Sequence, residues 1–137
     1  MTDLITRLSK LDAPDREVDA EIAIHLLGYT RVNRMARWPE TQPIWDFYEG
    51  EPLNSNGVLI PRYTGSLDAI RSLARRLYPD VMYRVGNDGE GPDPSLYLGE
   101  LFIPGEQKDS YFTGLSPVDA VSLCIALLRA KEASNAE

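Results

Sequence analysis

Apolar side chains recur every three to four residues in three separate parts of the chain, the spacing of a helix with one buried face. The pattern predicts three helices: one over residues 3–10, a second that begins within 12–17 and runs to about 27, and a third over 67–77. Gly28 is a natural C-cap for the second helix, and Tyr78-Pro79 ends the third. The positions that define the three apolar faces are Leu4, Ile5, Leu8, Val18, Ile22, Leu26, Leu67, Ile70, Leu73 and Leu77.

The last apolar segment, residues 116–130, is apolar almost all round. Ser116 and Pro117 are residue types favoured at the N-cap and first position, so we expect a helix that begins at Ser116. A helix without a broad polar face must be covered on nearly every side. It therefore lies either in a central core or in a subunit interface, and we expect a homo-oligomer. Residues 132–137 are expected to fray.

Residues typical of β-strands occur at 81–85 and 96–103 and predict an antiparallel hairpin, with an acidic loop from Gly86 to Pro94 between them. Residues 111–113 predict one more strand, whereas residues 29–61 show no regular period and predict irregular structure with short strands. The whole pattern predicts a single α+β domain over residues 1–137, ordered from about 3 to 131, with a small antiparallel sheet covered by helices.

Length and composition fit one globular domain, with 137 residues, 43% hydrophobic and 26% charged. The N-terminus lacks the pattern of a secretory signal, and no run approaches a membrane span of about 18 apolar residues. One cysteine excludes an internal disulfide framework. These features predict a cytoplasmic protein with no membrane partner, and the net charge of -7 argues against binding to a nucleic-acid polymer.

The sequence offers little for catalysis. Nucleophilic catalysis needs a histidine near the nucleophile, but His25 lies mid-helix and Cys124 lies in the most apolar segment, so both are interpreted as structural. The acidic loop does not fit the spacing of a calcium loop, and neither a phosphate loop nor a dinucleotide fingerprint occurs. We therefore expect no enzyme activity, no metal and no cofactor.

One segment has the chemistry of a ligand site. Residues 61–66 place an arginine, an aromatic ring and two hydroxyls directly before a predicted helix N-terminus, where free backbone amides can hold an anion. A second arginine beside a tryptophan could join them to clamp a nucleotide by stacking and arginine–phosphate pairing. The alternative is that the hydroxyls only cap the helix and the tyrosine packs on the sheet. The candidate residues are Arg62, Tyr63, Thr64, Ser66, Arg37 and Trp38.

Three segments, in this order, resemble the phage ABA sandwich family. They are Asp15-Arg16-Glu17-Val18-Asp19-Ala20-Glu21-Ile22-Ala23, Tyr63-Thr64-Gly65-Ser66-Leu67-Asp68-Ala69, and Ser116-Pro117-Val118-Asp119-Ala120 continuing through Leu123-Cys124-Ile125-Ala126-Leu127-Leu128-Arg129-Ala130. The resemblance implies an α-β-α layered sandwich and a small accessory protein of tailed phages or prophages. The acidic loop from Gly86 to Pro94 departs from the shorter central region of that family.

The resulting hypothesis is a non-catalytic, homo-oligomeric accessory protein that binds a host-derived molecule in the host cytoplasm. Its specific form is an anti-defence sponge that sequesters a nucleotide second messenger. The alternative is a protein–protein interaction module or inhibitor that presents an acidic surface, including Asp88, Glu90 and Asp93, to a host protein. A nucleotide-processing enzyme is the least favoured class.

Overall fold

The computed structural model describes residues 2–32, 43–87, 96–105 and 108–135. Within these ranges the chain forms four helices and six strands. The elements in chain order are α1 (Thr2–Ser9), α2 (Arg16–Leu27), β1 (Arg31–Val32), β2 (Ile44–Tyr48), β3 (Glu51–Asn54), α3 (Leu67–Leu77), β4 (Met82–Gly86), β5 (Tyr97–Ile103), β6 (Ser110–Ser116) and α4 (Asp119–Asn135).

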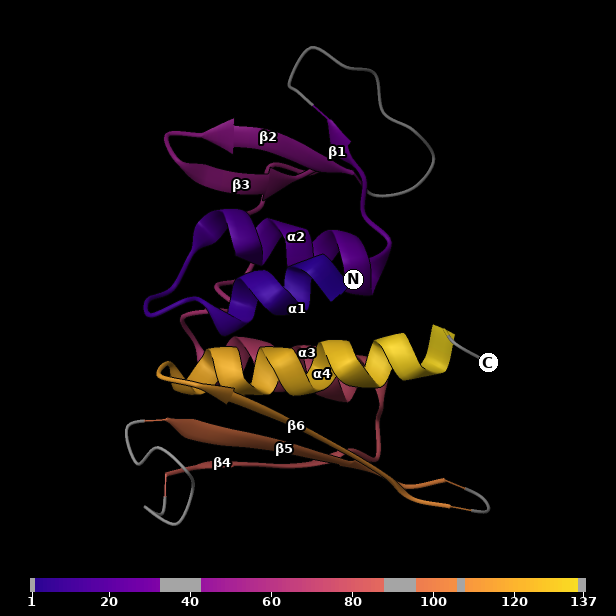
Figure 1. Cartoon of the computed structure of the whole chain (residues 1–137). Coiled ribbons are helices and arrows are strands. Elements are labelled where there is room, and N and C mark those ends of the chain that lie inside the picture. The colour runs from indigo at the N-terminus through magenta and orange to yellow at the C-terminus, as the bar shows by residue number, and fades with distance from the viewer. Residues whose placement is uncertain (1, 33–42, 88–95, 106–107, 136–137) are drawn as a thin grey trace.

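The helices lie between two small sheets, as Figure 1 shows. One sheet has the order β1-β2-β3, with a parallel β1–β2 pair, and the other is the antiparallel sheet β4-β5-β6. The predicted α+β sandwich is thus confirmed, including the hairpin of β4 and β5. The order of layers differs from the α-β-α arrangement implied by the resemblance, because in the described part of the chain each sheet has helices on one side only.

The helix boundaries follow from local capping. The Asp15 carboxylate accepts hydrogen bonds from two first-turn amides of α2, and Gly28 ends that helix in the left-handed conformation with φ 72°. The Ser66 hydroxyl accepts from the Ala69 amide at 3.2 Å and begins α3. The last helix begins at Asp119 rather than Ser116, because Ser116 is still the final residue of β6. It also continues to Asn135, beyond the predicted end near residue 131.

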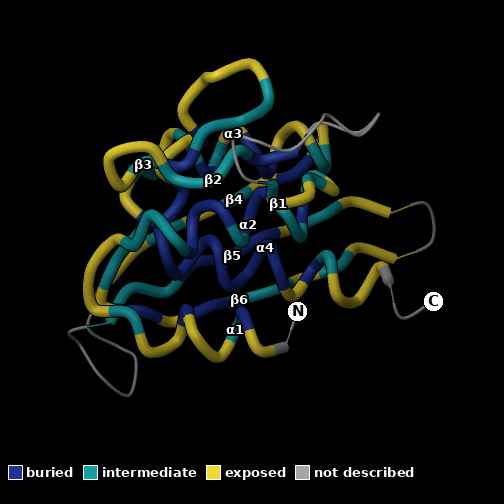
Figure 2. The backbone as a smooth tube through the Cα atoms, turned by 90° about the horizontal axis from the view of Figure 1, so that it is seen from above, coloured by how far each residue is buried: buried dark blue, intermediate teal, exposed yellow. Residues whose placement is uncertain are grey.

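Helix α4 is the centre of the core. All residues from Ala120 to Leu128 are buried, and Figure 2 shows the buried backbone concentrated in the central helices. The helix packs against β5 and β6 on one side and against α1 and α3 on the others. Contacts within one chain therefore account for its apolar surface, whereas its predicted part in an oligomer stays a prediction.

Two glycines let α4 approach the sheet closely. Gly99 of β5 and Gly114 of β6 are directly paired across the strands. A Cβ atom at Gly99 would lie 2.6 Å from the Ser122 carbonyl carbon, and one at Gly114 would lie 2.3 Å from the Ser122 oxygen. A side chain at either position would push the helix away from the sheet, so both sites require glycine.

The region without a regular pattern forms the other sheet. Strands β2 and β3 are joined by a two-residue turn at Glu49 and Gly50, which have φ of 52° and 83°. Such positive values at both positions are typical of a type I′ hairpin turn. The predicted short strands are confirmed here. In the described part of the chain, no helix combines the length and apolar character that crossing a membrane requires.

Candidate functional site

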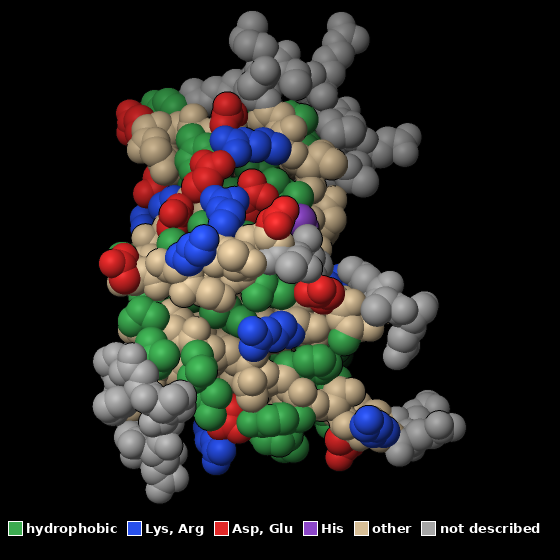
Figure 3. Space-filling view, in the orientation of Figure 1, with side chains coloured by type: hydrophobic (Ala, Val, Ile, Leu, Met, Phe, Trp, Pro, Cys, Tyr) green, Lys and Arg blue, Asp and Glu red, His purple; other side chains and the backbone are tan. Residues whose placement is uncertain are grey.

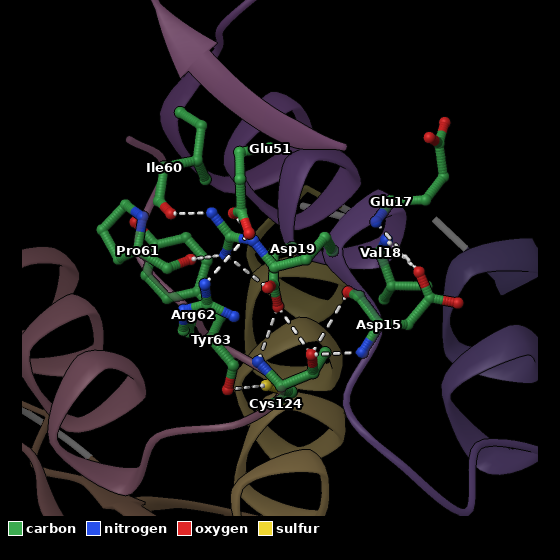
Figure 4. Close-up of polar contacts among 12 residues, drawn as sticks. Asp15, Glu17, Val18, Asp19, Glu51, Ile60, Pro61, Arg62, Tyr63 and Cys124 are labelled. Atoms are coloured by element: carbon green, nitrogen blue, oxygen red, sulfur yellow. Dashed lines mark hydrogen bonds and ion pairs between the residues drawn. The ribbon is translucent and has the colours of Figure 1, made fainter. Parts of the chain in front are cut away.

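The segment predicted to bind a ligand is largely buried. Tyr63 is 4% exposed and Thr64 is fully buried. Figure 4 shows the backbone of Tyr63 beside Cys124 of α4. The Thr64 amide and hydroxyl both donate to the same oxygen of the Asp19 carboxylate, each at 2.7 Å. The Thr64 hydroxyl oxygen also accepts from the Asp15 amide at 2.9 Å. The amide and hydroxyl of Thr64 therefore form hydrogen bonds within the protein.

Arg16 completes this arrangement from the first turn of α2. Its Nη1 donates to Asp19 at 2.7 Å and its Nε donates to Glu51 at 2.7 Å. Its Nη2 donates to the Ile60 carbonyl at 2.6 Å. We call Asp15, Arg16, Asp19, Glu51 and Thr64 the Asp19 network. It joins α2, β3 and the segment before α3, and its opposite charges face one another at short distance.

These positions correct the predicted nucleotide clamp. Burial raises the pKa of Tyr63 to about 12, and the Tyr63 carbonyl accepts from the Cys124 thiol at 3.3 Å. A ligand cannot stack on a ring in the core, and Ser66 is used as the N-cap of α3. Among the predicted residues that are described, Arg62 is exposed and pairs with Glu51 at 3.0 Å. Arg37 and Trp38 lie outside the described residues.

A second arginine–aromatic cluster lies where α3 faces β4. The Arg71 guanidinium carbon is 4.7 Å from the centre of the Tyr83 ring, and that of Arg75 is 5.4 Å from it. A hollow of about 240 Å³ opens beside this ring. We call its lining together with Arg75 the arginine–tyrosine hollow: Leu67, Arg71, Arg75, Tyr83, Arg84 and Val85.

The charges around this hollow are only partly balanced. Arg71 lies 3.7 Å from Asp68, a carboxylate that is 96% exposed and strongly screened by solvent. Arg84 pairs with Glu100 at 2.8 Å. Arg75 is exposed and has no carboxylate partner among the described residues. The hollow is therefore positively charged on a chain whose net charge is negative.

The geometry of the cluster suits an anion with an aromatic part. The guanidinium carbons of Arg71 and Arg75 lie over the Tyr83 ring, and guanidinium N–H donors can pair with phosphate or carboxylate oxygens. The exposed Arg75 can also stack on a base. The sequence does not single out Tyr83, because a strand position gives no sign of which helix it will face.

Cys124 and His25, the two residues considered for catalysis, lie on helices of the core layers. Cys124 is fully buried in α4, and burial raises the pKa of its thiol well above the ordinary value. His25 is partly exposed on α2, with Nε2 3.8 Å from a Glu21 oxygen one turn away. Within the described ranges, no three histidine, cysteine or carboxylate side chains converge as a metal site would require. The acidic residues Asp88, Glu90 and Asp93 lie outside those ranges.

Comparisons with models of known protein families, with curated proteins and with solved structures found no match to this chain. The resemblance to the phage ABA sandwich family therefore stays a prediction from the sequence.

Proposed function

We propose that this protein is a non-catalytic binding protein that holds a nucleotide second messenger at the arginine–tyrosine hollow. The observation that carries the proposal is the pair of arginines stacked on Tyr83, one of which has no carboxylate partner in the described chain. Stacking holds both guanidinium groups in place before a ligand arrives. Binding then costs less side-chain entropy than it would with two freely rotating arginines.

The size of the hollow defines how such a ligand would bind. Its volume of about 240 Å³ is below the range of roughly 300–1,000 Å³ typical of pockets that enclose a whole small molecule. It is large enough for a phosphate group and part of a sugar or base. The ligand would place its phosphate between Arg71 and Arg75 and leave the remainder on the open surface beside β4.

The biological setting follows from the resemblance. A small accessory protein of a tailed phage, present in the host cytoplasm, would act as an anti-defence sponge if it removed a nucleotide signal from the host. A sponge needs a high-affinity site and no chemistry. The buried thiol of Cys124 and the position of His25 on α2, in another layer from β4, support a binding role over a catalytic one.

Native mass spectrometry with cyclic di-AMP and with ADP-ribose tests the proposal, because it reports occupancy and conversion of the ligand together. We expect one of these nucleotides to bind with its mass unchanged. We also expect Arg75→Gln to weaken that binding at least about tenfold, since a charged hydrogen bond to phosphate is lost.

Conversion of the nucleotide would contradict the non-catalytic proposal, and absence of binding to both probes would contradict the nucleotide class. In the second case the alternative of a protein interaction module gains weight. In the described part of the chain, the carboxylates of Glu17, Asp46, Glu51 and Glu100 are paired with arginines, which leaves less unpaired acidic surface there. Figure 3 shows such mixed charges over α2 and β2-β3.

A further inference from the structure

The sheet β4-β5-β6 has one face covered by helices and one face open (Figure 1). The strand pairing arranges the nine outward residues of that open face in three rows of three. The two outer rows are apolar apart from one glycine, and the middle row is polar. The rows are Met82, Phe102 and Tyr111; Arg84, Glu100 and Thr113; and Gly86, Leu98 and Leu115.

Several of the apolar side chains are exposed. Met82 is 61% exposed, Tyr111 51% and Leu115 43%. The rings of Phe102 and Tyr111 lie against each other, with centres 4.7 Å apart. An open face of an antiparallel sheet normally carries mostly polar residues in this alternation, so apolar groups on two of three rows indicate a surface that is covered in the working protein.

The middle row carries no net charge. Arg84 donates to one oxygen of Glu100 through Nε at 3.0 Å and Nη2 at 2.8 Å. The Tyr111 hydroxyl donates to the other oxygen at 2.6 Å, which raises the pKa of Tyr111. Glu100 is 5% exposed, and both of its carboxylate oxygens accept hydrogen bonds. Its neutralisation removes the repulsion that a net charge would cause between two copies of this face.

We infer that the open face of β4-β5-β6 binds a second copy of this chain. A twofold interface brings one patch against itself, so the patch must be complementary to itself. A neutral polar row between two apolar rows meets that condition, whereas the rest of the chain, with a total charge of -7, repels its copy. A strongly acidic or basic partner would find no charge to attract it here.

The size of the face predicts a modest affinity. Strands β5 and β6 have seven residues each and β4 has five, so at about 4.8 Å between strands and about 3.4 Å per residue the face covers roughly 310 Å² in plan. Protruding side chains increase the accessible area, but it stays at or below the ~800 Å² per partner of a standard interface. We therefore expect a dimer that dissociates in the micromolar range, with the two sheets packed face to face.

Sedimentation equilibrium without any nucleotide tests this inference separately from the proposed function. We expect the native chain to shift from monomer to dimer as its concentration rises through the micromolar range. Met82→Asp and Leu115→Asp place a charge on the two apolar rows and should each weaken dimerisation at least about tenfold. Both residues are exposed, so the fold should tolerate the changes. Val58→Asp, at another exposed apolar residue outside the sheet, is the matched control.

Three outcomes would overturn the inference. The first is a native chain that remains a monomer at the highest concentration. The second is a dimer that neither Met82→Asp nor Leu115→Asp weakens. The third is a dimer that Val58→Asp weakens as strongly as those two substitutions do. Because no nucleotide is present, each outcome leaves the proposed ligand site untouched. Conversely, a failure of nucleotide binding in a dimer that is sensitive to Met82→Asp would contradict only the ligand proposal.

Discussion

Two arginine–tyrosine clusters have different surroundings in the folded protein. In the Asp19 network and around Arg62, carboxylates lie within about 3 Å of both arginines, and the neighbouring Tyr63 is buried. In the arginine–tyrosine hollow the ring stays partly exposed and Arg75 has no such partner in the described chain. The first cluster stabilises the fold, and the second has charge left with which to bind a ligand.

The role of each arginine therefore depends on whether carboxylates lie beside it in the folded protein. Asp19 and Glu51 are separated from Arg62 by many positions in the chain, yet they converge on the segment before α3 and use its hydrogen-bonding capacity. Beside Tyr83, Arg71 lies 3.7 Å from Asp68, whose carboxylate is almost entirely in water. Substitutions can remove contacts of the first cluster or test whether the second binds a ligand.

The largest effect is expected from Asp19→Asn. The amide keeps the size of the side chain, and its oxygen can still accept from Thr64, but its NH₂ group then faces the Nη1 donor of Arg16. We expect the free energy of unfolding to fall by about 3 kcal/mol, as when one member of a buried ion pair is removed. Urea denaturation measures the change. Asp12→Asn, at an exposed aspartate near α2, is the control and should change stability little.

The ionisation of the buried Tyr63 should cost the native protein stability at high pH, and Tyr63→Phe should remove that contribution. The folded protein holds the pKa of Tyr63 at about 12, against an ordinary value of 10.0. Below the lower value both states are protonated; between the two values the unfolded chain ionises first, so stability falls as pH rises. Over this window the loss approaches 2–3 kcal/mol, at about 1.4 kcal/mol per pH unit. Urea denaturation below and above the window measures the difference.

The control for this experiment is Tyr48→Phe, at a tyrosine that is 48% exposed. That variant should keep the alkaline loss of the native protein. An equal alkaline loss in the Tyr63→Phe protein would show that other groups cause it and that the ring is not held in the core as described.

Tyr83→Leu should weaken nucleotide binding by about fivefold, which corresponds to about 1 kcal/mol for lost cation–π contacts with Arg71 and Arg75. The arginines remain present, so the change tests their positioning rather than their charge. Isothermal titration measures the affinity. If the leucine variant bound as tightly as the native chain, the stacked arrangement would play no part in binding.

The smallest effect on stability is expected from Arg62→Gln. Arg62 has a side chain that is 60% exposed and makes one ion pair with Glu51, which keeps the stronger contact with Arg16. A surface pair of this kind contributes at most about 0.5–1 kcal/mol. A loss as large as that from Asp19→Asn in the same urea experiment would place Arg62 inside the Asp19 network.

Local signals predicted much of the fold. Three helices were located from their apolar spacing, and the caps at Gly28 and Ser66 lie where the residue types suggested. The start of α4 was misplaced because Ser116 and Pro117 suit a helix N-terminus, yet Ser116 pairs with Tyr97 at the end of β6. Cross-strand pairing depends on partners far along the chain, and no local pattern reports it.

The candidate site was harder to predict for the same reason. Residues 61–66 carry groups that can bind a ligand. Only the folded chain shows that the Thr64 hydroxyl is already hydrogen-bonded to Asp15 and Asp19. The hollow combines Arg71 and Arg75 from a helix with Tyr83 from a strand. The helix over residues 67–77 was predicted, whereas the contact of its arginines with the ring is a tertiary contact.

The most direct test of the account compares two single-charge removals by isothermal titration with the nucleotide that binds, cyclic di-AMP or ADP-ribose. Arg75→Gln should weaken binding at least about tenfold and Arg62→Gln should leave it nearly unchanged, with both proteins folded. If Arg62→Gln weakened binding as much as Arg75→Gln, or if Arg75→Gln had no effect, the ligand would not be held where α3 faces β4.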